Sequence, residues 1–278
     1  MTRTTWAAVA LRAAAVAVTI GVAGCAQPTP EQKVVDDAAA ALGGRDAILK
    51  AKTLVLEGEG TNGNLGQDMT PEAAGQIFQV TGYKRAVDLG AERMRIEQTR
   101  TPSFTYFQGQ AAQKQVQGVD GQVGYNVAPN GSATRTPDPA ATDRRGDIYH
   151  HPLTLVRAAL DPGAKLTNPR TTGGERAVDV TTAKGALFTL AINDATGLPT
   201  RVVQMRDNTN LGDVAVETSF SEYKDIGGLK LPARLVTKTD KYQTAELKIG
   251  TQALDGEAGD LAAPAAAASA PSVAGVPP

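Results

Sequence analysis

The sequence predicts an α+β protein that is mainly β, in which an antiparallel sheet is covered by a few helices. Two observations support this prediction. Residues 186–240 alternate apolar and polar side chains in four short segments separated by turn sequences, as half-buried strands do. Helical spacing of apolar residues is found in only a few short segments, so few helices are available to cover so wide a sheet.

The four segments between residues 186 and 240 are expected to form an antiparallel meander. Residues 194–199 join two of the strands through an Asp, a Gly and a Pro, and Gly227-Gly228 makes a tight hairpin turn. Alternate residues of a strand point to the same face of a sheet. The face that we expect to be apolar contains Phe188, Leu190, Ile192, Val214, Val216 and Phe220.

The N-terminal part of the domain begins as helix and continues into the sheet. Residues 31–42 carry apolar residues near one helical face, Gly43-Gly44 ends that helix, and residues 45–51 allow one or two more turns. Residues 53–60 predict the first strand. Asn, Gly, Asp and Pro dominate residues 61–75, which are therefore expected to form a loop.

More strands and a further helix follow. Residues 77–89 and 93–99 predict a hairpin, residues 104–107 start an extended segment, and Asp120-Gly121 predicts a two-residue turn. Residues 128–145 are rich in Pro, Gly, Thr and Asp and are expected to form a loop. The other predicted elements are strands at 123–127, 177–183 and 244–251 and a helix at 152–160.

The N-terminus predicts an export signal. Residues 1–24 contain two arginines and an apolar run at 13–22, which is short for a membrane span and fits the core of a signal peptide. Residues 22–25, Val-Ala-Gly-Cys, resemble the bacterial lipobox, whose cysteine is acylated and becomes the mature N-terminus. Cys25 is the single cysteine of the chain. The alternative is an ordinary secretory signal with an incidental cysteine.

The lipobox predicts a protein held at the cell envelope by lipid. Two or three acyl chains, at about 0.8 kcal/mol per buried CH₂, make a durable anchor. Residues 25–30 would form a lipidated tether, and Ala26 resembles the residue that follows the cysteine in outer-membrane-directed lipoproteins. We therefore expect a periplasm-facing protein at the outer membrane.

One domain is expected at residues 31–254, followed by a tail. Residues 255–278 are rich in Ala and Pro, and such a composition offers little apolar area to offset the entropy of ordering. The segment is expected to be a disordered tail or a linker. If the segment is a linker, a further domain would follow it.

Composition and motifs argue against nucleic-acid binding and against catalysis. The formal net charge is −1, which provides no basic field for a phosphate backbone. His150 and His151 are the two histidines, and neighbours in sequence point in different directions, so they cannot build a metal site or a catalytic triad. We interpret them as a helix-entry pair with one ring packed. The charged cluster before them, Asp143, Arg144, Arg145 and Asp147, is expected to be a solvated loop.

No nucleophile elbow, phosphate-binding loop or dinucleotide fingerprint occurs in the sequence. We therefore expect no enzyme activity, no metal and no cofactor.

Two stretches of the predicted meander resemble the lipoprotein-carrier superfamily of LolA and LolB. They are Asp194…Gly197-Leu-Pro199 and Phe220-Ser-Glu-Tyr223 followed by Gly228-Leu-Lys-Leu-Pro232. The resemblance covers about residues 31–251. It implies a strongly curved antiparallel sheet, a half-open barrel, with helices on the concave side and an apolar cavity between them. It also implies binding of acyl chains or another lipid, for which we expect the face containing Phe188 and Phe220 to be used.

Two alternatives remain at this point. The N-terminal region is also similar to the one that precedes the catalytic domain of some metallo-β-lactamase-fold hydrolases, which would make the chain a non-catalytic accessory region. A structural or interaction lipoprotein without a ligand would have the same sequence pattern, with the apolar face forming an ordinary core.

The lipobox yields a direct prediction about Cys25. We expect mass spectrometry of the mature protein to find a chain that begins at Cys25 and carries its acyl groups. The variant Cys25→Ala should stay unprocessed or leave the membrane fraction. An unmodified Cys25, or cleavage at another bond, would contradict the lipobox assignment.

Overall fold

The computed structural model describes residues 27–65, 76–103, 111–208 and 212–274. The predicted signal peptide, Cys25 and the predicted extended segment at 104–107 lie outside the described residues. The strands are β1 (Thr53–Asn64), β2 (Gln76–Asp88), β3 (Arg93–Pro102), β4 (Gln113–Asp120), β5 (Val123–Val127), β6 (Ala133–Arg135), β7 (Lys165–Thr172), β8 (Glu175–Thr181), β9 (Leu187–Asn193), β10 (Pro199–Asn208), β11 (Gly212–Ile226), β12 (Leu229–Thr239) and β13 (Tyr242–Leu254). The helices are α1 (Pro30–Leu42), α2 (Arg45–Lys50), α3 (Asp138–Ile148), α4 (Pro152–Ala159) and α5 (Ala265–Ser269).

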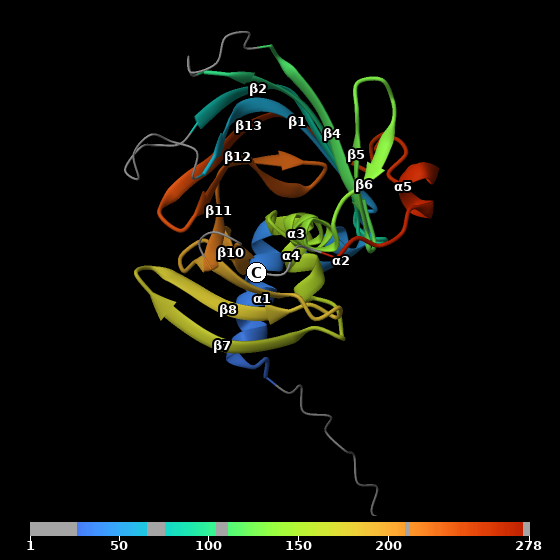
Figure 1. The fold of residues 1–278 in the computed structure, drawn as a ribbon. Coiled ribbons are helices and arrows are strands. Elements are labelled where there is room, and N and C mark those ends of the chain that lie inside the picture. Colours follow the sequence, from blue (N-terminus) through green and yellow to red (C-terminus); the bar gives the residue numbers. More distant parts are fainter. Residues whose placement is uncertain (1–26, 66–75, 104–110, 209–211, 275–278) are drawn as a thin grey trace, which may run out of the picture.

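The strands form one antiparallel sheet in the order β6-β5-β4-β3-β2-β1-β13-β12-β11-β10-β9-β8-β7. Strands that are neighbours in sequence pair with each other, except β6 and β7, which form the two edges of the sheet. The first and last strands, β1 and β13, pair at its centre. The sheet curls around α1, α3 and α4 without closing on itself (Figure 1). The predicted fold class, a curved antiparallel sheet with a few covering helices, is therefore confirmed.

Two glycines allow the sheet to bend sharply at its centre. A Cβ added to Gly58 would lie 2.1 Å from the backbone oxygen of Lys248, and one added to Gly60 would lie 1.9 Å from that of Glu246. Pairing of β1 also shifts register next to Gly58, on the β13 side and on the β2 side. Bulges increase the local twist and bend of a strand. The backbone of β13 can approach β1 this closely only because both side chains are missing.

The helices α1 and α4 fill the concave side with apolar side chains. A capping box starts α1, because the Thr29 side chain accepts from the Gln32 backbone and the Gln32 side chain accepts from the Thr29 backbone. Gly43, at φ 125°, ends it. The buried residues that these two helices add to the main core are Val34, Val35, Ala38, Ala39, Leu42, Leu153, Leu155, Val156 and Ala159. They pack against the sheet residues of the same cluster, which include Leu54, Leu56, Val87 and Met94.

The four-strand meander is confirmed as β9 to β12, and the structure differs from the prediction elsewhere. Residues 61–64, predicted as loop, continue β1, while residues 128–145 contain β6 and most of α3. The strand β7 was not predicted, because its Lys165–Thr172 sequence is exposed almost throughout and has no apolar alternation. Pro30, placed in the tether, is the first residue of α1.

The C-terminal segment also differs from the prediction of a disordered tail, since residues 255–274 lie on the convex side of the sheet. Leu261 is buried against Val55 and Ala86, which face away from the main core. Beyond it, α5 lies beside β5 and β6 (Figure 1). The Val273 oxygen accepts from the Asp138 backbone at 2.8 Å. Tertiary contacts order this segment although its composition does not favour order.

The close approach at Gly60 predicts a large effect of a single methyl group. We expect Gly60→Ala to lower the free energy of unfolding by at least about 2 kcal/mol, since the methyl group would overlap a backbone oxygen that cannot rotate away. The matched control is Gly63→Ala in the same strand, where the nearest atom would be 3.5 Å away. Urea unfolding measures both. Equal stability of the two variants would contradict this account of the curvature.

Candidate functional site

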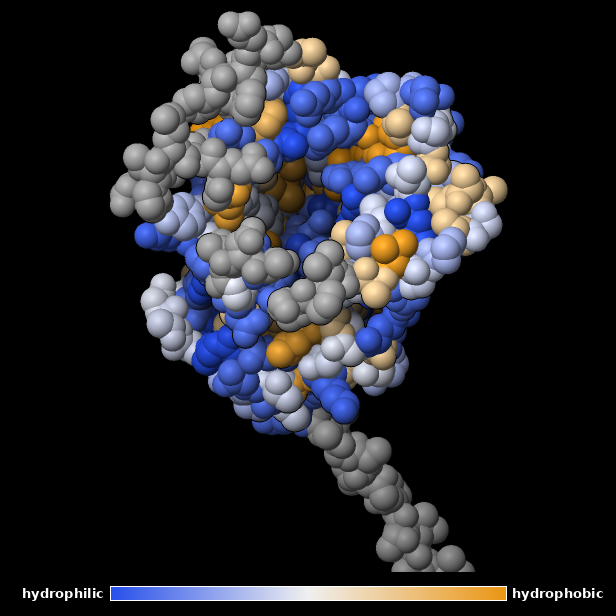
Figure 2. All heavy atoms as spheres, viewed as in Figure 1, coloured by the Kyte–Doolittle hydropathy of each residue, from blue (hydrophilic) through white to orange (hydrophobic). Residues whose placement is uncertain are grey.

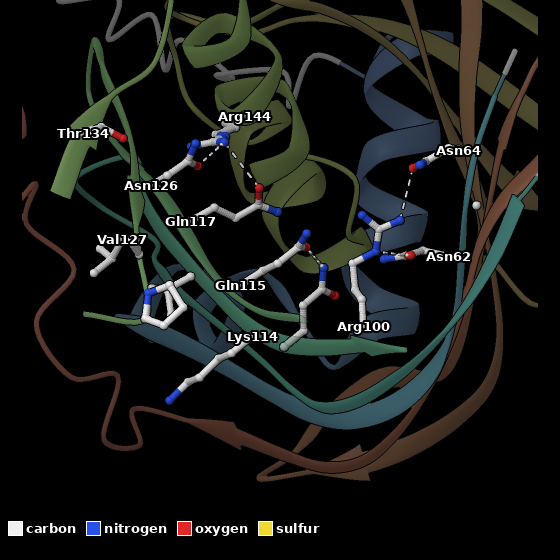
Figure 3. Close-up of a pocket in the computed structure, with 15 residues that line it drawn as sticks. Asn62, Asn64, Arg100, Lys114, Gln115, Gln117, Asn126, Val127, Thr134 and Arg144 are labelled. Carbon is white, nitrogen blue, oxygen red and sulfur yellow. Dashed lines mark hydrogen bonds between the residues drawn. The ribbon is translucent and has the colours of Figure 1, made fainter. Parts of the chain in front are cut away.

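A cavity of about 530 Å³ opens on the concave side of the N-terminal half of the sheet. Its walls come from the ends of β1, β3, β4, β5 and β6 and from α3 (Figure 3). Figure 2 shows that the molecule is hollowed where the concave face opens, with hydrophobic residues in its depth and hydrophilic residues around the rim. The cavity is therefore accessible from solvent.

The polar lining of this cavity has an unusual composition. Two cationic and six amide side chains point into it, and no carboxylate occurs among the described residues that line it. These side chains are Arg100, Arg144, Asn62, Asn64, Gln98, Gln115, Gln117 and Asn126. We call this set the arginine–amide hollow. Cations that meet only neutral acceptors keep the electrostatic potential of a cavity positive.

Arg100 is held on one side of the arginine–amide hollow by β1. Its Nε donates to Asn62 Oδ1 at 2.8 Å and its Nη2 donates to Asn64 Oδ1 at 3.1 Å. The guanidinium lies 3.8 Å from the centre of the Phe78 ring. Burial lowers the pKa of Arg100 from its ordinary value. The register explains the cluster, because Asn62 pairs with Phe78 and Arg100 pairs with Val80, the next residue on the same face of β2.

Arg144 reaches the other side of the arginine–amide hollow from α3. Its Nη1 donates to the backbone oxygens of Tyr125 at 2.6 Å and Gly118 at 3.2 Å. Its Nη2 donates to Asn126 Oδ1 at 2.7 Å and to Gln117 Oε1 at 3.3 Å. Burial lowers the pKa of Arg144, since none of these acceptors carries a charge that would compensate for lost water. The side chain thus fastens α3 to β4 and β5.

Two further arginines fasten the C-terminal end of α3 to the sheet. Arg85 Nη2 donates to the backbone oxygens of Asp147 at 2.5 Å and Ile148 at 3.2 Å, at the end of the helix where the dipole favours a cation. Arg206 Nη2 donates to Asp147 Oδ1 at 2.7 Å. The prediction of a solvated loop at Asp143–Asp147 is therefore wrong. These residues form a helix whose charged side chains bind strands that are distant in sequence.

The predicted ligand face is located in the other half of the sheet. Phe188, Leu190 and Ile192 in β9 are at most 1% exposed, Val214 is 2% exposed and Phe220 is 8% exposed, whereas Val216 is half-buried. The Tyr149 ring lies 5.2 Å from the Phe188 ring, and the His151 ring lies 6.4 Å from the Phe220 ring. The residues linking α3 and α4 thus cover much of this face. Its role in binding a ligand stays a prediction.

A row of cross-strand neighbours connects this face to the arginine–amide hollow. The pairs of the register run Phe220–Leu235, Leu235–Leu247, Leu247–Gly60, Gly60–Val80 and Val80–Arg100. Directly opposite residues point to the same face of a sheet. The concave surface is therefore apolar along this row until it reaches Arg100. We call it the apolar row.

The sequence analysis did not identify the arginine–amide hollow. One signal was present, because Gln113, Gln115 and Gln117 recur at every second position of β4 and would share a face. Alternating amides on a strand indicate a polar face. The sequence does not say which face of the sheet these amides occupy. The strand register places them on the concave face.

Comparison with known proteins finds no family model that matches the chain and no curated protein that matches it. Among solved structures, the chain is similar to a LolA superfamily protein of Nitrosomonas europaea, with 12% identity, a TM-score of 0.47, and coverage of 81% of this chain and 94% of that one. It is also similar to a DUF1329 family protein of Desulfovibrio piger, with 13% identity, a TM-score of 0.40, and coverage of 81% and 93%. LprF of Mycobacterium bovis has 10% identity, a TM-score of 0.31, and coverage of 86% and 99%.

The first of these belongs to the superfamily that the sequence motifs resemble. The similarity to regions that precede metallo-β-lactamase-fold domains stays a prediction.

The described residues also bear on two other kinds of site. They contain no group of three or more His, Cys, Asp or Glu side chains placed to hold a metal ion. No helix within them is long and apolar enough to cross a membrane.

His150 and His151 are both buried, which goes beyond the expected single packed ring. His150 Nδ1 lies 3.0 Å from Thr218 Oγ1, while His151 Nδ1 accepts from the Leu153 backbone at 3.3 Å and caps α4. Burial lowers the pKa of His150 to about 3, with Arg206 as a lesser cause. Burial also lowers the pKa of His151 well below its ordinary value. Both rings are therefore neutral in the folded protein at neutral pH.

These shifts predict a loss of stability in mild acid. Between pH 6.5 and about 3 the unfolded chain binds protons that the folded His150 does not, so stability falls as the pH is lowered through this window. From pH 7.5 to pH 5 we expect His150 to account for a loss of about 2 kcal/mol, and His151, whose pKa is also lowered, to add to this loss. Urea unfolding at both pH values measures it. The variant His150→Gln should lose about 2 kcal/mol less stability over this pH range than wild type. Equal losses of stability in the two proteins would show that His150 is protonated in the folded state.

Proposed function

We propose that this protein is a lipid-anchored, periplasm-facing envelope protein that binds an apolar ligand, an acyl chain or another lipid, on the concave side of its sheet. The observation that carries the proposal is the apolar row, which leads from the predicted ligand face to an open cavity. The lipobox at residues 22–25 supports the anchor, and Ala26 supports the outer membrane.

The open end of the concave face offers apolar surface that its own helices leave incompletely covered. Leu247 in the apolar row is half-buried. Val216 is also half-buried, and it lies four residues from Phe220 on the same face of β11. At about 25 cal/mol per Å², burial of 200 Å² of a ligand would contribute roughly 5 kcal/mol before the costs of binding. Phe188, Leu190, Ile192 and Val214 would then form the packed wall behind the ligand, and Val216 and Phe220 would contact it.

A charged residue at the rim tests this proposal. We expect Val216→Asp to weaken the binding of a fluorescent fatty acid at least tenfold, because the carboxylate would lie where the acyl chain passes. The protein would be the mature chain without its acyl groups, titrated at fixed salt. Since Val216 is half-buried, the substitution should leave the fold intact, which circular dichroism checks.

The matched control is Val203→Asp in β10. Val203 is also half-buried, but it pairs with Glu217 and so lies on the convex face. It should bind the fatty acid as wild type does. Absence of saturable binding to the wild-type protein would contradict the proposal and would leave a structural or interaction lipoprotein.

A further inference from the structure

We infer that the arginine–amide hollow binds an anionic headgroup, a phosphate or a carboxylate, of the ligand whose apolar part lies along the apolar row. This inference rests on the proposed function and adds the chemical class of the ligand. It follows from the charge balance of the hollow, from the orientation of its hydrogen-bonding groups and from its position at the end of the apolar row.

The charge balance of the hollow differs from that of the rest of the sheet. Arginines on the convex face have carboxylate partners, as in Arg93–Asp120 at 2.7 Å, Arg201–Glu175 at 2.8 Å and Arg234–Glu246 at 2.9 Å. Arg100 and Arg144 form no ion pair with any carboxylate of the described residues. The chain has 29 acidic residues for 28 basic ones, so acidic partners are not scarce. Two cations without a carboxylate partner around one cavity are suited to an anionic ligand.

The hydrogen bonds of the amides point to the same ligand class. Asn62, Asn64, Gln117 and Asn126 use their oxygens to accept from the two arginines. Their NH₂ groups make no hydrogen bond within the described part of the chain and are left to donate. Figure 3 shows Arg100 and Arg144 on two sides of the cavity, with Gln115 and Gln117 between them. The arrangement therefore presents donors, which match the acceptor oxygens of a phosphate or carboxylate.

Arg100 is placed to make the first contact. Asn62 and Asn64 hold its Nε and Nη2, and the Phe78 ring covers one face of the guanidinium, so its orientation is set before a ligand arrives. Its Nη1 has no acceptor among the described residues. Arg144 donates through both Nη atoms to four oxygens, so it contributes its charge while it holds α3. Lys114 pairs with Thr99, so its exposed side chain points to the convex face and away from the hollow (Figure 3).

The position of the hollow makes an amphipathic ligand the natural occupant. Val80, the last apolar member of the apolar row, pairs directly with Arg100. An apolar chain along the row would bring its polar end to Arg100. The cavity of about 530 Å³ falls in the range of small-molecule sites.

The experiment compares two lipids that differ only in the headgroup. Dihexanoyl phosphatidic acid and dihexanoyl glycerol would be titrated calorimetrically into residues 26–278, a chain that retains every described residue. We expect phosphatidic acid to bind at least tenfold more tightly than dihexanoyl glycerol. The ratio of these two affinities should fall as the salt concentration is raised. In Arg100→Gln the ratio should drop to about one while the affinity for dihexanoyl glycerol is unchanged. Lys114→Gln, which removes a neighbouring cation on the convex face, should leave the ratio unchanged.

The control is Arg234→Gln, which removes a cation from the convex face. It should retain the ratio of wild type. Equal binding of the two lipids by wild type, or a full ratio in Arg100→Gln, would overturn the headgroup site and leave the proposed function standing. Binding of neither lipid would overturn both. Inorganic phosphate bound as tightly as phosphatidic acid would overturn the lipid as the source of the anion.

Discussion

The close contact between the first and the last strand is the constraint on which the rest of this structure depends. At Gly58 and Gly60 the backbone of β13 lies where a side chain of β1 would have to be. Strands in such contact can twist and coil strongly, which an ordinary pair with side chains on both strands cannot do. Because β1 and β13 are at the centre of the sheet order, their coiling bends the whole sheet. A flat sheet would have no concave side for helices or ligands.

The concave side is filled in two physically different ways. Under α1 and α4 the filling is apolar, with side chains such as Leu42 and Leu153 that are fully buried. The helix α3, by contrast, has a strongly polar sequence and is fixed by arginines that reach backbone oxygens, amides and the Asp147 carboxylate. Burying a charge is costly unless it is hydrogen-bonded, and each of these guanidiniums has several acceptors. The apolar core therefore ends before the open end of the sheet, where polar side chains occupy the concave side instead.

The contrast between the two halves of the concave face links the structure to its proposed ligand. One half, around Phe188 and Phe220, is covered by the residues that link α3 to α4. The other half opens to solvent and is lined by cations and amides. The apolar row joins them across the central strands. Phe220, Leu235 and Val80 in this row are buried, and Leu247 is half-buried. An acyl chain beside Leu247 with an anionic end at Arg100 would match this arrangement.

The sequence by itself determined the strands and much of their pairing. Alternation of apolar residues located β9 to β12, and Gly227-Gly228 placed the hairpin turn, because the period of a strand and the left-handed conformation of glycine are local properties. The tertiary structure alone decided what covers each face. Composition indicated a loop at 138–145 and disorder at 255–274, yet contacts from distant strands turn the first into α3 and hold the second on the convex side. The arginine–amide hollow likewise joins Asn62, Arg100 and Arg144, whose convergence depends on strand register and sheet curvature rather than on spacing in the chain.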